Sequence, residues 1–309
     1  MKILVTGGAG FIGSHVADAF LQDGHEVAVL DSLLTGHARN LNPNARFFEA
    51  DMRDKARVDA VFAEFRPDAV SHHAAQISVP DSVEDPAFDA QSNIVGGLNV
   101  WRAARDNGAR RFIFASSGGA IYGDAQPLPL AETQVAAPLS PYGLSKQVFE
   151  MYLAQLRAAS EMVPVVLRYA NVYGPRQGAK GEAGVVSVFT RRLLNGQPCT
   201  IFGDGSMTRD YVFVGDVRRA NQLALEKGDE GVFNIATGTQ TTTLELFHLV
   251  RELLGIDSDP MFAPERAGEV RYSALDAGKA RRELGWEPKV ELRAGLEQVV
   301  AYDRTHRED

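Results

Sequence analysis

Short apolar segments alternate with helical patterns through the first half of this 309-residue chain. Between the apolar segments the spacing predicts helices, as over residues 13–22, where Val16, Phe20 and Leu21 form one stripe. Strand–helix repetition of this kind implies a doubly wound parallel sheet, which binds ligands at the carboxyl ends of its strands. The predicted strands cover residues 2–5, 26–30, 68–72, 111–115 and 163–169.

The pattern changes after about residue 170. Gly, Pro and charged residues dominate residues 174–184, a helix is predicted near 185–195, and a Gly-rich turn follows at 203–205. We therefore expect a smaller α/β lobe towards the C-terminus. The expected domains are residues 1–170 with a returning segment at about 211–240, and a lobe made of residues 171–210 and 241–309.

Charge and cysteine content exclude several classes of function. The net charge is −8 without any block of Lys or Arg, so we expect neither nucleic acid nor an anionic membrane as a partner. The single cysteine excludes an intrachain disulfide. The pair His72-His73 has no second group of ligands, so we expect one buried and one near-surface histidine and no metal site. With no signal or membrane-spanning pattern, a cytoplasmic protein is expected.

A glycine-rich turn, Thr6–Gly13, separates the first strand from the first helix. Glycines allow a tight turn and a close approach of a pyrophosphate, and the helix N-terminus presents free N–H groups to it. The spacing fits two registers, Gly7/Gly10/Gly13 and Gly8/Gly10/Gly13. Asp31 ends the second strand at the spacing expected for a carboxylate that binds an adenosine ribose. Because this carboxylate repels a 2′-phosphate, NAD is favoured over NADP, although Arg39 lies nearby.

Tyr142 and Lys146 lie four residues apart, after Ser140 as predicted N-cap and Pro141 at the first helical position. They therefore share one face of a helix. Hydride removal from a carbinol carbon needs a base for the hydroxyl proton, and free tyrosine titrates near ~10. An ammonium about 4 Å away supplies ~4 kcal/mol of anion stabilisation at an effective dielectric of ~20, which is sufficient near neutral pH. This pair is a predicted acid/base centre.

With these motifs the chain resembles the extended short-chain dehydrogenase/reductases, namely the NAD-dependent epimerases and dehydratases of the UDP-glucose 4-epimerase group. The resemblance implies a Rossmann-type fold, NAD as cofactor, a UDP-sugar substrate, and a homodimer through the Tyr142 helix and the helix after about Asp89. The matching segments span the chain: residues 6–13, 51–52, 73–76, 93, 116–123, 142–146, 167–176 and 209–212.

The resemblance also implies roles for individual residues. In relatives the tyrosine is the base and the lysine holds the nicotinamide ribose. The implied cofactor-binding residues are Gly7, Gly10, Phe11, Ile12, Gly13, Asp31, Ser32, Gly36, Asp51, Met52, His73, Ala74, Ala75, Gln76, Ser92, Asn93, Ser116, Tyr142, Lys146 and Tyr169. The implied substrate-binding residues are Ser117, Tyr142, Asn171, Val185, Val186, Thr200, Phe202, Arg209, Arg266, Glu269 and Ser273.

The third catalytic residue departs from the family pattern. Relatives place a Ser or Thr before the "YG" motif, and counting back from Tyr122 puts that position on Gly118. We expect Ser117 to take the role. The alternative is that Ser116 and Ser117 only cap the end of a strand.

The resemblance also bears on the reaction. Dehydratases carry an Asp-Glu pair where Gly119 and Ala120 stand here, and neither of these can transfer a proton. The pattern favours epimerisation: hydride removal at C4, rotation of the 4-keto sugar and hydride return. Ser273 stands where relatives have a bulky or a small residue, so N-acetylated UDP-hexoses are expected to fit as well. The alternatives are another nucleotide-sugar epimerase, reductase or rearranged dehydratase, or a non-catalytic NAD-binding sensor.

Overall fold

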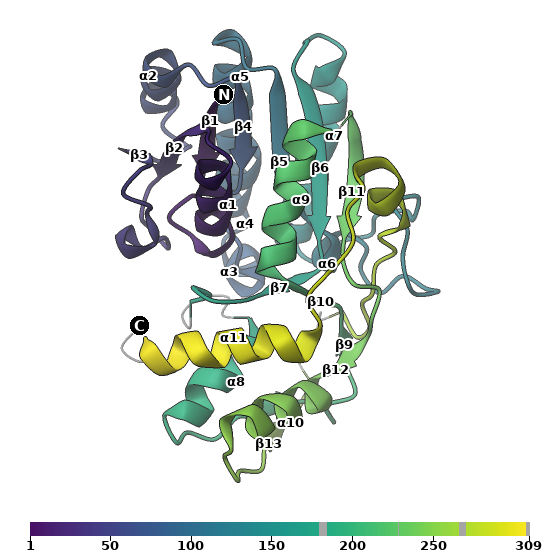
Figure 1. The fold of residues 1–309 in the computed structure, drawn as a ribbon. Coiled ribbons are helices and arrows are strands. Elements are labelled where there is room, and N and C mark those ends of the chain that lie inside the picture. The colour runs from purple at the N-terminus through teal and green to yellow at the C-terminus, as the bar shows by residue number, and fades with distance from the viewer. Residues whose placement is uncertain (179–183, 228, 266–269, 307–309) are drawn as a thin grey trace.

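A seven-stranded parallel sheet organises the structure, a computed structural model that describes residues 1–178, 184–227, 229–265 and 270–306 (Figure 1). Its order is β11-β6-β5-β4-β1-β2-β3, and every neighbouring pair is parallel. The strands are β1 (Lys2–Thr6), β2 (Glu26–Asp31), β3 (Arg46–Glu49), β4 (Ala69–His72), β5 (Arg111–Ser117), β6 (Val163–Tyr169) and β11 (Gly231–Ile235).

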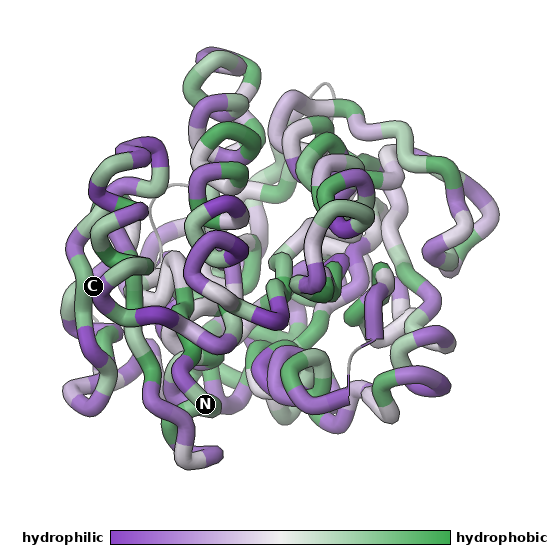
Figure 2. Tube along the Cα trace, turned by 90° about the horizontal axis from the view of Figure 1, so that it is seen from above, coloured by the Kyte–Doolittle hydropathy of each residue, from purple (hydrophilic) through white to green (hydrophobic). Residues whose placement is uncertain are grey.

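Helices cover both faces of this sheet (Figure 1). On one face α1 (Phe11–Gln22) and α9 (Val214–Glu226) enclose a core with the sheet, and on the other face α2 (Lys55–Phe65), α5 (Gly97–Asp106) and α7 (Pro141–Arg157) enclose a second core. Seen from above, the outer helices alternate between hydrophilic and hydrophobic residues along their turns (Figure 2), as helices with one buried face do. Short elements complete this part: η1 (Ala38–Asn40), α3 (Val79–Glu84), α4 (Pro86–Ala90), the π-helix η2 (Gln91–Gly96) and α6 (Gly118–Ile121).

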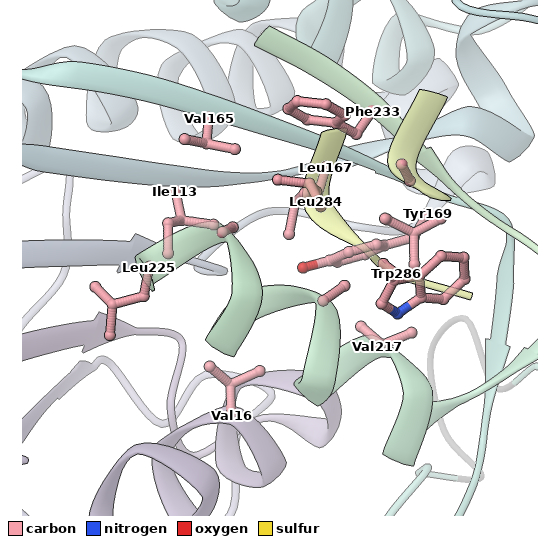
Figure 3. Packing of buried hydrophobic residues seen from close by; sticks show 14 of the residues in the cluster. Val16, Ile113, Val165, Leu167, Tyr169, Val217, Leu225, Phe233, Leu284 and Trp286 are labelled. Atoms are coloured by element: carbon pink, nitrogen blue, oxygen red, sulfur yellow. The ribbon is translucent and has the colours of Figure 1, made fainter. Parts of the chain in front are cut away.

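The first core extends to the C-terminal part of the chain. Val217 of α9 packs with Trp286 against the sheet (Figure 3), and the Trp286 indole N–H donates to the Asp216 carbonyl oxygen at 2.9 Å. Trp286 follows the π-helix η3 (Ala280–Leu284) and is fully buried. This contact fixes the path of the chain between the sheet and the final helix.

The remaining elements form a smaller part below the carboxyl ends of the strands (Figure 1). Its core is shared by three helices, α8 (Val185–Leu194), α10 (Thr243–Leu254) and α11 (Leu292–Thr305). A capping box of Thr242 and Glu245 begins α10. Three two-stranded sheets complete the structure: β7 (Asn171–Tyr173) with β10 (Tyr211–Phe213), β8 (Thr200–Phe202) with β13 (Met261–Ala263), and β9 (Thr208–Arg209) with β12 (Thr241–Thr242).

The doubly wound parallel sheet confirms the predicted fold class. Strand order reverses between β1 and β4, which makes this the switch point where such sheets bind ligands. Sequence reasoning did not single out β3 or β11, which extend the sheet at its two edges. Within the described ranges, no helix has the length and apolar character needed to cross a membrane.

Candidate active site

The turn between β1 and α1 lies at the switch point and accepts only glycine at two positions. Gly7 has a φ of +70°, and a Cβ there would lie 2.6 Å from the backbone nitrogen of Ala74, after β4. A Cβ on Gly13 would lie 2.2 Å from the Gly7 carbonyl oxygen. Gly10 is the N-cap of α1, which has no side-chain cap among the described residues, so its first N–H groups can bind an anion. A Cβ on Gly8 would also lie 2.7 Å from Val29 Cγ2, so the packing is compatible with both predicted registers. This cradle fits a pyrophosphate.

Asp31 ends β2 beside this turn and is 8 % exposed. Its carboxylate accepts hydrogen bonds from the backbone N–H groups of Ala9 (3.0 Å) and Leu33 (2.9 Å). Burial raises the pKa of the Asp31 carboxyl, whereas these two hydrogen bonds lower it. A Cβ on Gly36 would lie 2.9 Å from Asp31 Oδ1, so a larger residue there would press on the carboxylate. Ser32, the next residue, is exposed.

Asp51 and Met52 follow β3, next to the end of β2. The Asp51 carboxylate accepts from the Arg53 guanidinium, and this hydrogen bond holds the pKa of Asp51 below its ordinary value. Met52 is buried, and a Cβ on Gly96 of η2 would lie 2.8 Å from Met52 Cγ. The structure thus brings these two predicted cofactor-binding residues close to the predicted ribose carboxylate.

The segment after β4 is tied to η2. The backbone N–H of Gln76 donates to Asn93 Oδ1 (2.8 Å), and Asn93 Nδ2 donates to the Gln76 carbonyl oxygen (2.9 Å). Asn93 is buried, and π-helical turns such as η2 are frequent at functional sites. Four more predicted cofactor residues lie nearby in sequence: Phe11 and Ile12 begin α1 partly buried, Ala75 is partly buried, and Ser92 is buried in η2.

The two neighbouring histidines have different environments. His72 is buried among Phe112, Phe114 and Phe149, as expected for one of the pair. His73 is only partly exposed and stacks on the Tyr169 ring, with the ring centres 6.3 Å apart. One histidine of the pair is therefore buried in the core, and the other keeps part of its surface exposed at the end of β4.

The His73 ring also has an unused polar atom. Its Nε2 lies 2.9 Å from Ser71 Oγ, whereas its buried Nδ1 has no hydrogen-bond partner among the described residues. Burial, with a smaller contribution from the Lys146 charge, lowers the pKa of His73 to about 3, so the ring is neutral. A buried polar atom without a partner at the switch point fits a site that takes a polar ligand.

Tyr142 and Lys146 lie on the first turns of α7, whose N-cap is Ser140 with Pro141 in the first turn, as predicted. Lys146 is 4 % exposed, and its Nζ lies 5.9 Å from the centre of the Tyr142 ring. Nζ donates to the Ala115 carbonyl oxygen of β5 at 3.0 Å. Burial lowers the pKa of Lys146 to about 8. The structure thus brings the predicted acid/base pair together at the end of β5.

Ser116 and Ser117 have different environments. Ser116 is buried and donates to Glu150 Oε1 at 2.5 Å, in a network that includes the Arg168 guanidinium. Ser117 is partly exposed and is the N-cap of α6, and its hydroxyl has no hydrogen-bond partner among the described residues. The Ser116 hydroxyl is therefore already hydrogen-bonded in the interior, whereas the Ser117 hydroxyl is available to a ligand.

Gly118, the predicted counterpart of the family's Ser/Thr, has no space for a side chain. A Cβ there would lie 2.3 Å from Leu275 Cδ1, and 3.3 Å from the carbonyl oxygens of Arg168 and Tyr169. Leu275 is itself fully buried. A hydroxyl at position 118 would therefore point into the core, which explains why the available hydroxyl belongs to the preceding residue.

The predicted substrate residues that the structure describes come from both parts of the chain. Asn171 begins β7, and its buried Oδ1 has no hydrogen-bond partner within the described ranges. Arg209 donates to the Thr208 carbonyl oxygen at 2.9 Å. Thr200 is the first residue of β8 and Phe202 the last. Val185 is partly buried, Val186 packs in the core of the small part, and Ser273 is 5 % exposed. Arg266 and Glu269 fall outside the described residues.

Comparisons with known proteins agree with this geometry. The model of the NAD dependent epimerase/dehydratase family matches residues 3–236. The chain belongs to this family. A UDP-glucose 4-epimerase from Mycolicibacterium smegmatis is 44 % identical over 310 residues, covering 98 % of this chain and 99 % of the relative.

Solved structures of family members are also similar to this chain. A UDP-glucose 4-epimerase from Thermotoga maritima, solved with UDP-glucose, is 51 % identical with a TM-score of 0.98 and 100 % coverage of both chains. One from Thermus thermophilus, solved with NAD, is 46 % identical with a TM-score of 0.94, covering 98 % of this chain and 99 % of that chain. The predicted resemblance to this family, its fold and its cofactor is thereby confirmed.

Sequence reasoning missed the charged groups around Lys146. Glu150 lies four residues after Lys146, so Tyr142, Lys146 and Glu150 share one face of α7. This spacing is a signal that could have identified Glu150. Asp89 is buried in the five-residue helix α4, and no local pattern marks it. No group of three or more potential metal ligands occurs among the described residues.

The packing around Gly118 leads to a prediction. We expect Gly118→Ser to lower the free energy of unfolding by about 1–3 kcal/mol, because the new side chain overpacks against Leu275. Chemical denaturation measures this change. Gly119→Ser is the matched control, since a Cβ there lies 3.4 Å from Asn171 Oδ1, which is an ordinary contact. A Gly118→Ser variant of native stability that also restores activity to Ser117→Ala would contradict this assignment.

Proposed function

We propose that this chain is an NAD-dependent UDP-glucose 4-epimerase, which interconverts UDP-glucose and UDP-galactose. One observation carries the proposal: Tyr142 and the buried Lys146 meet the end of β5, where Gly119 and Ala120 offer no second acid or base. Relatives at 44–51 % identity over nearly the whole chain are UDP-glucose 4-epimerases, which supports the same activity here.

The switch point is the proposed site of NAD. We assign the Gly7–Gly13 turn to the pyrophosphate and Asp31 to the adenosine ribose, in a domain formed by residues 1–170 with the segment at about 211–240. The unpartnered His73 Nδ1 supports a polar ligand at this place. When bound, NAD accepts the hydride from the sugar carbon and returns it.

Tyr142 is the proposed base for the C4 hydroxyl of the sugar. At the 5.9 Å between Lys146 Nζ and the centre of the ring, an ammonium stabilises a negative charge by about 3 kcal/mol at an effective dielectric of about 20. The ionised tyrosine can then take the hydroxyl proton and give it back after the sugar has turned over. We assign the Ser117 hydroxyl to the same sugar oxygen, because it is available while that of Ser116 is not.

Epimerisation needs fewer proton-transferring groups than its alternatives. A 4,6-dehydratase must also remove a proton from one carbon and protonate a leaving hydroxyl on another, which requires an additional acid and base. Gly119 and Ala120 follow Ser117 without a carboxylate. The second candidate remains another enzyme on a nucleotide sugar, and a product with a 4-keto-6-deoxy sugar or a net consumption of NADH would favour it.

The small part of the chain is the proposed holder of the nucleotide sugar. The unpartnered Asn171 Oδ1 and the nearby Arg209 are proposed to contact the sugar and the diphosphate. We assign the uracil to β8, between Thr200 and Phe202. The proposed substrate-binding lobe consists of residues 171–210 and 241–309. The roles of Arg266 and Glu269 in substrate binding are proposed from the sequence alone.

We also propose that the enzyme is a homodimer in the cytoplasm, with a role in galactose metabolism. On neighbouring helical surfaces Val95 of η2 is 52 % exposed, and Met151 and Tyr152 of α7 are 63 % and 43 % exposed. Exposed apolar residues gathered on adjacent helices are typical of a protein–protein contact. Trp101, in contrast, is fully buried in the core and takes no part in this surface.

Replacement of Tyr142 tests the mechanism. We expect Tyr142→Phe to reduce the rate of UDP-galactose conversion by at least ~10²-fold, because the phenol oxygen that carries the proton is lost. NMR or chromatography of the products, without added cofactor, measures the rate. Tyr302→Phe, a change on the distant helix α11, is the matched control. Unaltered turnover by Tyr142→Phe would show that another group is the base.

Ser273 leads to a prediction about the substrate. Because this residue is small, we propose that it leaves space for an N-acetyl group at C2 of the hexose. We expect the enzyme to convert UDP-N-acetylglucosamine and UDP-N-acetylgalactosamine as well, at a rate that the same product assay can measure. No detectable conversion under conditions in which UDP-galactose turns over would refute this extension and leave the 4-epimerase proposal intact.

A further inference from the structure

Asp89 is a buried carboxylate for which the proposed reaction has no role. It lies in α4 and is 1 % exposed, whereas acidic side chains are almost never fully buried unless a partner compensates them. Its Oδ1 accepts a hydrogen bond from Asn93 Nδ2 at 3.0 Å, and no cation forms a direct ion pair with it among the described residues. The neutral amide alone does not balance its charge.

A chain of hydrogen bonds joins Asp89 to the catalytic helix. The same Asn93 Nδ2 lies 3.1 Å from Ser145 Oγ, and that hydroxyl donates to the Tyr142 carbonyl oxygen at 2.9 Å. Ser145 is buried and directly precedes Lys146. Asp89 is therefore connected to the turn of α7 that carries both residues of the acid/base pair.

The other titratable groups around Lys146 are either paired with an opposite charge or neutral. Glu150, on the same helix, forms a buried bidentate ion pair with Arg168, so the guanidinium balances most of its charge. His72 and His73 face Lys146 from the end of β4 and are neutral, because burial lowers the pKa of both. Asp89 is the remaining carboxylate near the ammonium whose charge no arginine balances in the described part of the chain.

We propose that Asp89 is a positioning residue for the reaction: its carboxylate provides the counter-charge for the Lys146 ammonium and, through Asn93 and Ser145, holds the first turns of α7 in place. This inference rests on the proposed function, in which Lys146 must be charged to stabilise ionised Tyr142. The electrostatics agree: after the lowering caused by burial, the Asp89 charge is the largest influence on the pKa of Lys146 and raises it. Burial raises the pKa of Asp89, whereas the Ser145 hydroxyl and then the Lys146 charge act against this rise.

The variant Asp89→Asn tests the proposal, because it removes the charge and keeps an oxygen that can accept from Asn93. The midpoint of the Lys146 titration, about 8 in the native protein, should fall by about one pH unit, since the attraction that favours the charged lysine is lost. Lysine ε-carbon NMR measures this midpoint, with the resonance assigned by Lys146→Arg. The alkaline limb of the kcat–pH profile for UDP-galactose should move to lower pH by the same amount, while KM changes less than about two-fold.

Asp85→Asn is the matched control. Asp85 is the exposed N-cap of the same helix, and asparagine caps a helix equally well, so the Lys146 midpoint should stay at its native value. Asp89→Ser is a second variant that removes the charge with a smaller side chain, and it should give the same shift. An unchanged midpoint in either Asp89 variant would overturn the proposal, even if thermal stability fell. If the native chain failed to convert UDP-galactose, the proposed function would fail, and the NMR titration would still decide the role of Asp89.

Discussion

A lysine ammonium lies in the interior of this protein, and the surroundings of Lys146 are arranged to keep it charged there. Burial alone disfavours the charged form, since an ion loses its hydration in the interior. The Ala115 carbonyl oxygen accepts one of its hydrogens, and Asp89 and Glu150 contribute negative charge from two helices. The resulting pKa of about 8 leaves the group charged near neutral pH and close to the Tyr142 ring. The proposed proton transfer depends on this balance.

The parallel sheet explains how distant parts of the sequence reach the same place. Because all seven strands point in one direction, their carboxyl ends lie along one edge, and the residues that follow them become neighbours. Asp31 ends β2, His73 follows β4 and Ser117 ends β5. The small part of the chain lies below the same edge (Figure 1). Its β7, which carries the proposed substrate residue Asn171, therefore belongs to the part that adjoins the strand ends. The fold thus supplies the arrangement, and a few side chains supply the chemistry.

Local signals explain what could be predicted from the sequence. The glycine turn, the five strands and the Ser140 cap of α7 are each set by residues within a few positions, so pattern and spacing identified them. The lack of space for a side chain at Gly118 could not be predicted in this way, because it is caused by Leu275, which lies 157 residues further along the chain. The role of Asp89 was hidden for the same reason: its connection to Ser145 crosses two helices and exists only in the folded chain. The hydroxyls of Ser116 and Ser117 could likewise be distinguished only from the folded chain, where Ser116 donates a hydrogen bond to Glu150.

Deuterium at C4 of UDP-galactose tests the proposed chemistry most directly. In the proposed chemistry Tyr142 exchanges a proton with the sugar oxygen, whereas the hydrogen on carbon leaves and returns as a hydride and is not released as a proton. After many turnovers in ordinary water, mass spectrometry should therefore find the deuterium still on the mixed UDP-glucose and UDP-galactose pool. Loss of the deuterium to solvent during turnover would mean that the carbon is deprotonated, and that the Tyr142–Lys146 pair does not act as described.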